Sequence, residues 1–264
     1  MRQRIITGLL LIGIGGLVIW QGGWILQIWL GIVSVMIAHE VSNMLTTAGH
    51  PIYRPILYLA SILSVASTSF FPEIWTQSYM HIMAIIVVGL CILELYLRRI
   101  VLLKSPVLAT LRMAALLTFT VPYIALVRDH TDQGILFMAL CVIPIWVTDI
   151  AALYGGKAIG KTPLSSISPK KTVEGTLIGI LSALIFMLAT AQWLGLPLLP
   201  YLGLAILVST GSQLGDLHES AIKRFCSVKD SGNALPGHGG FYDRADSTLY
   251  VFPCFFIIWQ LGLL

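Results

Sequence analysis

Apolar residues in this chain fall into long runs separated by short polar segments. Helices are predicted for these runs, because an open sheet would leave backbone groups unpaired in lipid. The nine predicted membrane-crossing helices lie at residues 5–20, 24–38, 55–71, 79–97, 105–127, 134–151, 174–193, 198–214 and 247–264. The first two runs are short and are joined only by Gln21-Gly-Gly23, so this pattern alone fits either two spans or one kinked span.

Composition favours a membrane protein over a soluble domain. Charged residues make up 11% of the 264 residues, and the mean hydropathy is +0.88; soluble domains have about 25% charged residues. The four cysteines show no pairing pattern, so buried free thiols are expected. No signal-peptide cleavage site follows the basic N-terminus, which is interpreted as part of a retained first span. The predicted fold class is therefore all-α: a polytopic integral membrane protein with about nine transmembrane helices.

The distribution of basic residues predicts the orientation. With nine spans and a cytoplasmic N-terminus, 14 of the 16 lysines and arginines fall in cytoplasmic segments, as the positive-inside rule requires. Joining the first two runs into one span would place Arg2 and Arg4 outside, so two spans are preferred. The net charge of +4 then reflects orientation and gives no reason to expect nucleic-acid binding. The C-terminus is predicted on the side opposite to the N-terminus.

The polar segments indicate where function resides. The two long ones, 152–173 and 215–246, both lie on the predicted cytoplasmic side. We predict one continuous membrane domain, with N-terminal helices over 1–130 and a catalytic region over 131–264. The active site is expected on the cytoplasmic side of the C-terminal half.

Acidic residues concentrate in the second of these segments. Asp216 and Glu219 are spaced i,i+3 and would share one helix face, and Asp243 and Asp246 repeat that spacing. Such carboxylates suit Mg²⁺, which leaves coordination positions for phosphate oxygens. Spacing alone does not exclude the alternative, in which these acids pair with the lysines and arginines of a solvated loop.

Two further segments suggest anion binding. Four glycines between 232 and 240 would let backbone amides approach an anion, although a flexible turn has the same composition. Ser168-Pro-Lys-Lys171 predicts a helix start with Ser168 as N-cap, where free amides and two lysines would bind a phosphate. The alternative for the second segment is a basic anchor before a span.

Together these segments resemble the phosphatidate cytidylyltransferases, also called CDP-diacylglycerol synthases. The resemblance covers about 149–246 in detail and the first 130 residues only as a series of spans. Two departures follow Asp149, where Ile150 and Leu153 replace an expected hydroxylic residue and tyrosine. The matching motifs are Ser168-Pro-Lys-Lys-Thr-Val-Glu-Gly175, Gly215-Asp216-Leu-x-Glu219-Ser220, Lys223-Arg224, Lys229-Asp230, Pro236-Gly-His-Gly-Gly240 and Asp243-Arg244-x-Asp246.

The resemblance implies transfer of a cytidylyl group from CTP to phosphatidate in phospholipid biosynthesis. It implies Mg²⁺ as cofactor, with a second cation left open, a homodimer in the lipid bilayer, and the cell inner membrane as location if the source is bacterial. Asp216 and Asp243 are expected as principal metal ligands, with Asp246 and Glu219 in support. The remaining residues expected at the catalytic centre are Ser220, Lys223, Arg224, Lys229, Asp230, His238 and Arg244. Those expected to bind substrate are Ser168, Lys170, Lys171, Thr172, Glu174, Gly237, Gly239, Gly240, Asp149 and Arg112.

Some individual roles stay open at this point. His238 either donates to the leaving pyrophosphate or stabilises the turn. Arg112, roughly 10 Å into the fifth span, either holds the lipid phosphate or neutralises Asp149. Alternatives to the whole assignment are a related CTP-dependent enzyme, which makes another CDP-lipid or phosphorylates a lipid alcohol, and a transporter. The absence of an inverted repeat in the sequence and the placement of the polar residues on one face disfavour transport.

Overall fold

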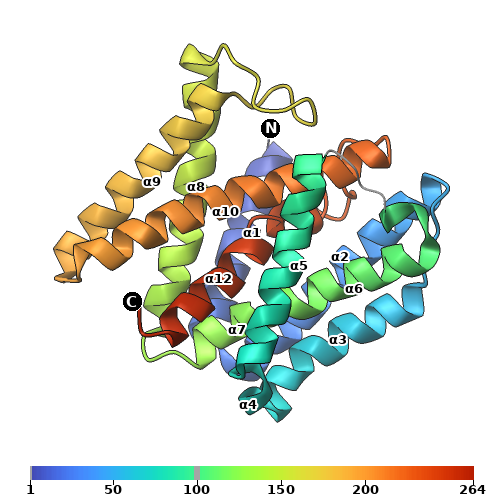
Figure 1. The fold of residues 1–264 in the computed structure, drawn as a ribbon, viewed down its shortest axis with the longest axis horizontal. Helices are drawn as coiled ribbons and strands as arrows, with labels where there is room; N and C mark the ends of the chain where they lie inside the picture. Colours follow the sequence, from blue (N-terminus) through green and yellow to red (C-terminus); the bar gives the residue numbers. More distant parts are fainter. Residues whose placement is uncertain (1, 98–101) are drawn as a thin grey trace.

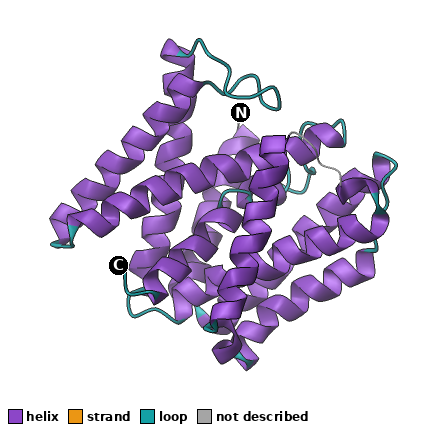
Figure 2. Ribbon diagram, in the orientation of Figure 1, coloured by secondary structure: helices purple, strands orange, loops and turns teal. Residues whose placement is uncertain are grey.

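The computed structural model of this chain describes residues 2–97 and 102–264. Within these ranges the regular elements are helices, and extended pairing is limited to isolated bridges (Figure 2). The α-helices are α1 (Arg2–Gln21), α2 (Gly23–Thr47), α3 (Arg54–Phe70), α4 (Pro72–Trp75), α5 (Ser78–Leu97), α6 (Pro106–Thr120), α7 (Pro122–Asp129), α8 (Gly134–Ile159), α9 (Val173–Leu194), α10 (Leu198–Phe225), α11 (Tyr242–Ala245) and α12 (Thr248–Gln260), with a 3-10 helix η1 (Leu102–Lys104) before α6.

The predicted all-α class is confirmed, and each of the nine apolar runs is largely helical. Helices α3 and α12, of 17 and 13 residues, are shorter than a full crossing requires. Among the described residues, six helical segments are long and apolar enough to cross a membrane: Gly23–Thr47, Ser78–Leu97, Pro106–Asp129, Gly134–Ile159, Val173–Leu194 and Leu198–Phe225. The count of nine spans stays a prediction. So does the sidedness of Arg98 and Arg99, which lie outside the described residues.

The first two apolar runs form two separate helices. Gly22 and Gly23 have φ angles of 65° and 51°, values that side-chain-bearing residues rarely adopt. The end of α7 holds this turn: the backbone amide of Gly23 donates to Asp129 at 3.0 Å, and Arg128 donates to the carbonyl oxygen of Ile19. In Figure 1 the chain reverses its direction between α1 and α2.

Several helices continue past the apolar runs that predict them. Helix α2 ends at residue 47, α8 at residue 159 and α10 at residue 225. Hydropathy falls at the first charged residues, whereas the backbone hydrogen bonds of a helix continue until a cap or a breaker. These polar extensions carry much of the site described below. Conversely, the fifth run is divided between α6 and α7 at Pro122, which has no N–H for a helical hydrogen bond.

Helix α10 occupies a central place, packed against α5, α8, α9 and α12 (Figure 1). The apolar core joins both halves of the chain. In one cluster Leu45 and Leu117 pack with Ile222 and Tyr250, and in another Tyr123 packs with Phe256. The segment 160–172, between α8 and α9, projects at the top of Figure 1, where the N-terminus also lies, and the C-terminus lies at the lower left.

Close packing of α8 on α9 sets the position of that projecting segment. A side chain at Gly175 would lie 2.6 Å from the carbonyl oxygen of Ala152, so only glycine allows this approach. The same contact surface includes Gly179, where a Cβ atom would lie 2.9 Å from the carbonyl oxygen of Thr148. The two helices therefore hold 160–172 beside the C-terminal part of α10.

Candidate active site

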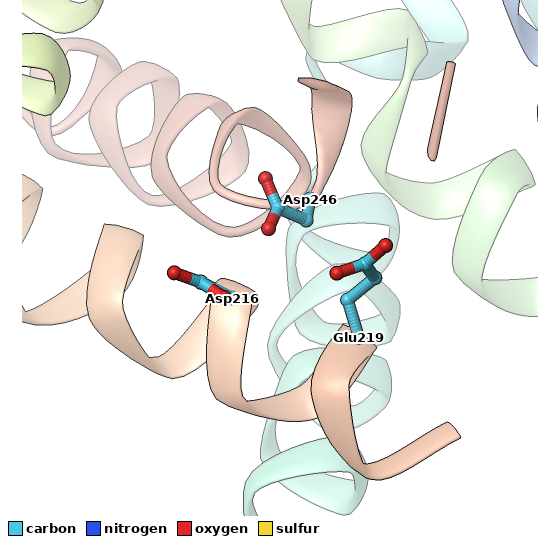
Figure 3. Close-up of side chains that lie close together, drawn as sticks. All are labelled: Asp216, Glu219 and Asp246. Atoms are coloured by element: carbon cyan, nitrogen blue, oxygen red, sulfur yellow. The ribbon is translucent and has the colours of Figure 1, made fainter. Parts of the chain in front are cut away.

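Three carboxylates converge where α10 meets the start of α12. Asp216 and Glu219 lie one turn apart on α10, and Asp246 lies between α11 and α12. One oxygen from each lies within 4.8 Å of the others, and Figure 3 shows the three side chains close together. Gly215 makes the convergence possible, because a Cβ atom there would lie 2.6 Å from the carbonyl oxygen of Asp246.

The cluster has unfavourable electrostatics without a cation. Glu219 and Asp246 are only 1% and 9% exposed, and Oε1 of Glu219 has no hydrogen-bond partner in the described part of the chain. Burial raises the pKa of Asp246 above its usual value, with further contributions from the nearby carboxylates of Asp216 and Asp149. A divalent cation would offset this repulsion, and an all-oxygen donor set is what Mg²⁺ prefers. The residues therefore fit a Mg²⁺ ion.

Lys223 links this cluster to the segment after α10. Its Nζ lies 2.5 Å from Oε2 of Glu219 and 2.6 Å from Oδ1 of Asp243, with 11% of the lysine side chain exposed. The other oxygen of Asp243 accepts hydrogen bonds from the amide and hydroxyl of Ser231 and from the amide of Gly240, at 2.8–2.9 Å. Burial by itself raises the pKa of Asp243, but hydrogen bonding from Glu219, and then from Gly240, Lys223 and Ser231, outweighs it and holds the pKa well below its usual value.

Asp243 lies beside this cluster. Its two oxygens contact Lys223, Ser231 and Gly240, and its role as a principal metal ligand stays a prediction. The carboxylates that lie together are Asp216, Glu219 and Asp246. Spacing in sequence could not separate Asp243 from Asp246, because α11 is short and turns the first of them toward Lys223.

The segment 160–172 contributes a second lysine. Lys171 forms an ion pair with Asp216, and these side chains are 28% and 33% exposed. Hydrogen bonds from the amide of Leu164 to the carbonyl of Lys171 (2.8 Å) and from the amide of Val173 to the carbonyl of Thr162 (2.9 Å) fix the backbone on either side of the contact. Lys170 is exposed to solvent.

The helix start predicted at Ser168 is wrong. Residues 168–171 form a turn, closed by the amide of Lys171 donating to the carbonyl of Ser168 at 3.0 Å. Helix α9 begins at Val173, and the hydroxyl of Thr172 caps it by accepting from the amide of Gly175 at 3.1 Å. Pairing of Pro163 with Thr172 keeps the chain extended up to the cap, which prevents an earlier start.

Glu174 holds the same segment together. Its carboxylate accepts hydrogen bonds from the backbone amides of Lys161 and Thr162 at 3.1–3.2 Å. Glu174 and Thr172, both predicted to bind substrate, thus make contacts within the protein that position Lys171.

The glycine turn binds carboxylates of the protein itself. Gly237 and Gly239 have φ angles of 78° and 81°, and the amide of Leu235 donates to the carbonyl of Gly239 at 2.9 Å. The amide of Gly240 donates to Asp243, and the next two amides, of residues 241 and 242, donate to Glu40 on α2. Of the amides in the predicted anion nest, that of Gly240 binds a carboxylate of the protein, and binding of a substrate phosphate by the turn stays a prediction.

Glu40 was missed by the sequence interpretation. It is 4% exposed and lies about 200 residues before its partners in the chain. The predicted second helix ends at residue 38, so Glu40 falls just outside it. The available signal was a carboxylate directly after an apolar run, since an acid inside a membrane helix indicates function by default.

The other predicted residues surround this centre at different depths. Ser220 is buried on α10, whereas Arg224, Lys229 and Asp230 are exposed at its end and in the segment that follows. Arg244 is exposed and donates from Nε to the carbonyl oxygen of His238 at 3.1 Å. The half-buried His238 ring packs over Gly8 of α1. Asp149 is exposed on α8 and close enough to affect Asp246 electrostatically.

Arg112 does not neutralise Asp149, and that alternative is wrong. The guanidinium of Arg112 pairs with Glu94 of α5 and contacts the ring of His218, with 7% of the arginine side chain exposed. Glu94 is on the neighbouring helix α5, and its carboxylate compensates the buried charge of Arg112, so no acid of α8 is needed for this. The pair Glu94–Arg112 therefore contacts α10 through His218.

Comparison with known proteins places these residues in a wider context. A model of the cytidylyltransferase family matches residues 2–261. The phosphatidate cytidylyltransferase of Bacillus subtilis is 42% identical over 142 residues, which are 53% of this chain and 53% of that protein. Those of Synechocystis and Helicobacter pylori are 42% and 39% identical over 140 residues each, covering 52% of this chain and 48% and 53% of the relatives. The matched part of this chain thus spans about half the length of each of these relatives.

Proposed function

This chain belongs to the cytidylyltransferase family, and on that premise we propose that it transfers a cytidylyl group from CTP to phosphatidate. The products are CDP-diacylglycerol and pyrophosphate. The observation that carries the proposal is the convergence of three carboxylates with Lys171 and Lys223. A transfer between two anionic phosphates needs such an array of charges, because positioning and electrostatic stabilisation provide most of its catalysis.

We assign Mg²⁺ binding to Asp216, Glu219 and Asp246. When bound, the ion would supply positive charge beside the phosphates of CTP, which neutralises their repulsion toward the attacking phosphate. Oε1 of Glu219 has no hydrogen-bond partner among the described residues, and this and the raised pKa of Asp246 support the assignment. Asp243 acts instead by holding Lys223.

The protein's own groups serve the two halves of the exchange. A phosphate oxygen of phosphatidate forms a bond to the α-phosphorus of CTP, and the bond from that phosphorus to the β-phosphate oxygen breaks. Lys171 is exposed enough to leave Asp216 and bind a phosphate, with Lys170 beside it. The exposed Arg224 and Lys229 are placed to bind the nucleotide phosphates from the other side. No side-chain nucleophile is needed, since the lipid phosphate is already an anion.

We further propose that this site faces the cytoplasm. CTP is a cytosolic anion that does not cross the bilayer, so 152–173 and 215–246 would both lie on that side, together with the N-terminus. The proposal agrees with the bias of basic residues toward these segments. The homodimer implied by the resemblance stays a prediction.

Turnover of labelled CTP by the purified protein tests the function. In mixed micelles with phosphatidate and Mg²⁺ we expect equal amounts of CDP-diacylglycerol and pyrophosphate, and we expect chelation of the metal to stop both. Long-chain alcohols in place of phosphatidate test the lipid-kinase alternative. Phosphorylation of the alcohol without nucleotidyl transfer would overturn the proposal, as would solute flux into vesicles with no CTP turnover.

A further inference from the structure

Glu40 of α2 makes contacts that neither the motifs of the resemblance nor the comparisons assign to it. Its carboxylate accepts hydrogen bonds from the amide of Phe241 (2.9 Å), the amide of Tyr242 (3.0 Å) and the hydroxyl of Ser231 (3.1 Å). All three donors belong to the segment between α10 and α12. One side chain from the N-terminal half thus binds both sides of the glycine-rich turn, at Ser231 before it and at Phe241 and Tyr242 after it.

The glycines of that segment fit this carboxylate closely. A Cβ atom at Gly232 would lie 2.9 Å from Oε1 of Glu40, and one at Gly240 would collide with Oε2. Gly232 and Gly240 therefore allow the backbone to wrap around Glu40. The anion bound by the amides of Phe241 and Tyr242, directly after the glycine-rich turn, is therefore a side chain of the protein.

Glu40 is connected to the candidate metal site through a short chain of hydrogen bonds. The hydroxyl of Ser231 lies within hydrogen-bond distance of both Glu40 (3.1 Å) and Asp243 (2.9 Å). Asp243 in turn binds Lys223, whose other partner is Glu219 of the carboxylate cluster. A shift of the turn would move Asp243, and Lys223 would then pull Glu219 out of the cluster or leave it uncompensated.

We propose that Glu40 is a positioning residue for the cytidylyl transfer, because it fixes Ser231 and Asp243 and through them Lys223 and the metal ligand Glu219. The expected effect of Glu40 on kinetics rests on the proposed function. Its expected effect on cation binding can be measured without turnover. Glu40 does not touch the substrates or the reacting atoms. Its geometry requires both oxygens as acceptors, since two of the three donors are backbone amides that no other group in the described residues is seen to bind.

The test compares Glu40→Gln, Glu40→Asp and Ser42→Ala with the wild type in lipid nanodiscs. Glutamine turns one acceptor into a donor that faces a backbone N–H, and aspartate keeps the charge but shortens the reach. Ser42→Ala is the matched control: Ser42 is buried on the same helix, and its hydroxyl donates to the carbonyl of Ala38 within α2. Three quantities are measured: kcat and KM for CTP as a function of Mg²⁺, Mn²⁺ binding by electron paramagnetic resonance, and the melting temperature.

For Glu40→Gln we expect kcat and Mn²⁺ affinity to fall by about 10- to 100-fold, the range found when groups behind metal ligands are removed. KM for CTP at saturating Mg²⁺ should change little. Glu40→Asp should recover part of both losses, and Ser42→Ala should behave as the wild type. In a Glu40→Gln, Ser231→Ala double variant the losses should not add, because both residues act through one chain of contacts.

Unchanged kcat and Mn²⁺ affinity in folded Glu40→Gln would overturn the proposal. So would losses that merely follow the melting temperature and appear equally in Ser42→Ala. If the wild type binds Mn²⁺ but turns over no CTP, the proposed function fails while weaker Mn²⁺ binding by Glu40→Gln still supports the role of Glu40. A wild type that neither binds Mn²⁺ nor turns over CTP contradicts both proposals.

Discussion

The two lysines of the candidate active site contact carboxylates in different surroundings. Lys223, on α10, has 11% of its side chain exposed and binds two carboxylates, those of Glu219 and Asp243. Lys171, in the segment 160–172, has 28% exposed and binds Asp216, which is itself 33% exposed. One lysine is enclosed by fixed acceptors, and the other meets a partner that solvent also reaches.

This difference assigns the lysines different tasks. Removing one member of a buried ion pair leaves an uncompensated charge and costs roughly 3–5 kcal/mol. A solvent-exposed pair contributes only about 0–1 kcal/mol, so Lys171 can exchange Asp216 for a substrate phosphate at little cost. We infer that Lys223 maintains the charge array and that Lys171 is the cation that moves between protein and substrate.

Replacement of Lys223 by methionine should have the largest effect. It leaves Glu219 and Asp243 buried without their common cation, so we expect destabilisation by roughly 3–5 kcal/mol together with loss of turnover. Thermal unfolding in detergent and CTP turnover measure the two effects. Lys223→Arg keeps the charge and should lose less stability. A Lys223→Met protein that unfolds at the wild-type temperature would remove the distinction between the two lysines.

Asp216→Asn should abolish activity with little effect on folding. The side chain is partly exposed and its partner Lys171 can remain solvated, but the proposed metal site loses a ligand. We expect kcat to fall on the order of 10²- to 10³-fold, as when a group that stabilises transition-state charge is removed. Asp243→Asn is the matched comparison. It should lose both activity and stability, because Asp243 accepts from Lys223, Ser231 and Gly240. Near-normal turnover of Asp216→Asn at saturating Mg²⁺ would exclude Asp216 from the metal site.

Lys171→Gln should affect substrate binding more than stability. Loss of one hydrogen bond to a charged phosphate corresponds to a rise of roughly 10- to 100-fold in KM for CTP or phosphatidate. The melting temperature should stay close to that of the wild type, because the pair with Asp216 is partly exposed to solvent. Lys170→Gln is the control from the same turn, and its smaller effect would reflect general attraction of anions. Equal effects of the two variants would mean that Lys171, despite its contact with Asp216, has no special role in binding the substrate phosphate.

Much of this arrangement could be predicted from local sequence patterns. Apolar runs indicate helices because the bilayer allows few alternatives, and each of the nine runs is largely helical. The i,i+3 spacing of Asp216 and Glu219 placed them on one face of a helix, and both lie in the carboxylate cluster. The pairing of Lys171 with Asp216 agrees with the expectation that 152–173 and 215–246 form one site.

Contacts between distant segments could not be read from spacing. Nothing near Glu40 in sequence indicates that its partners are Phe241 and Tyr242, because that contact depends on how α2 packs beside α11. The sequence does not show which acid pairs with Arg112. The packing of α5 on α6 makes Glu94 its partner. The start of α9 was misplaced because Ser168-Pro is a good local cap, whereas the bridge between Pro163 and Thr172 is a tertiary constraint.

The comparison of the two lysines requires that both segments face the same side of the membrane. A single-cysteine accessibility scan in sealed, oriented vesicles tests this with the smallest perturbation of the protein. Cysteines at Ser166 and Asn233 report on the two segments, and one at Asp132 reports on the turn before α8; all three positions are exposed. Ser231 is unsuitable as a label site because it is buried between Glu40 and Asp243.

We expect labels at Ser166 and Asn233 to react from the cytoplasmic side only, and a label at Asp132 from the opposite side only. The physical reason is parity, since the two helices α9 and α10 separate the segments and return the chain to its starting side. The four native cysteines are replaced first. Three of them are buried, and Cys254 is partly exposed. Each labelled variant should retain CTP turnover before modification, which controls for correct insertion. If the cysteines introduced at Ser166 and Asn233 were labelled from opposite sides, the membrane would separate Lys171 from Lys223. No shared site could then include both lysines.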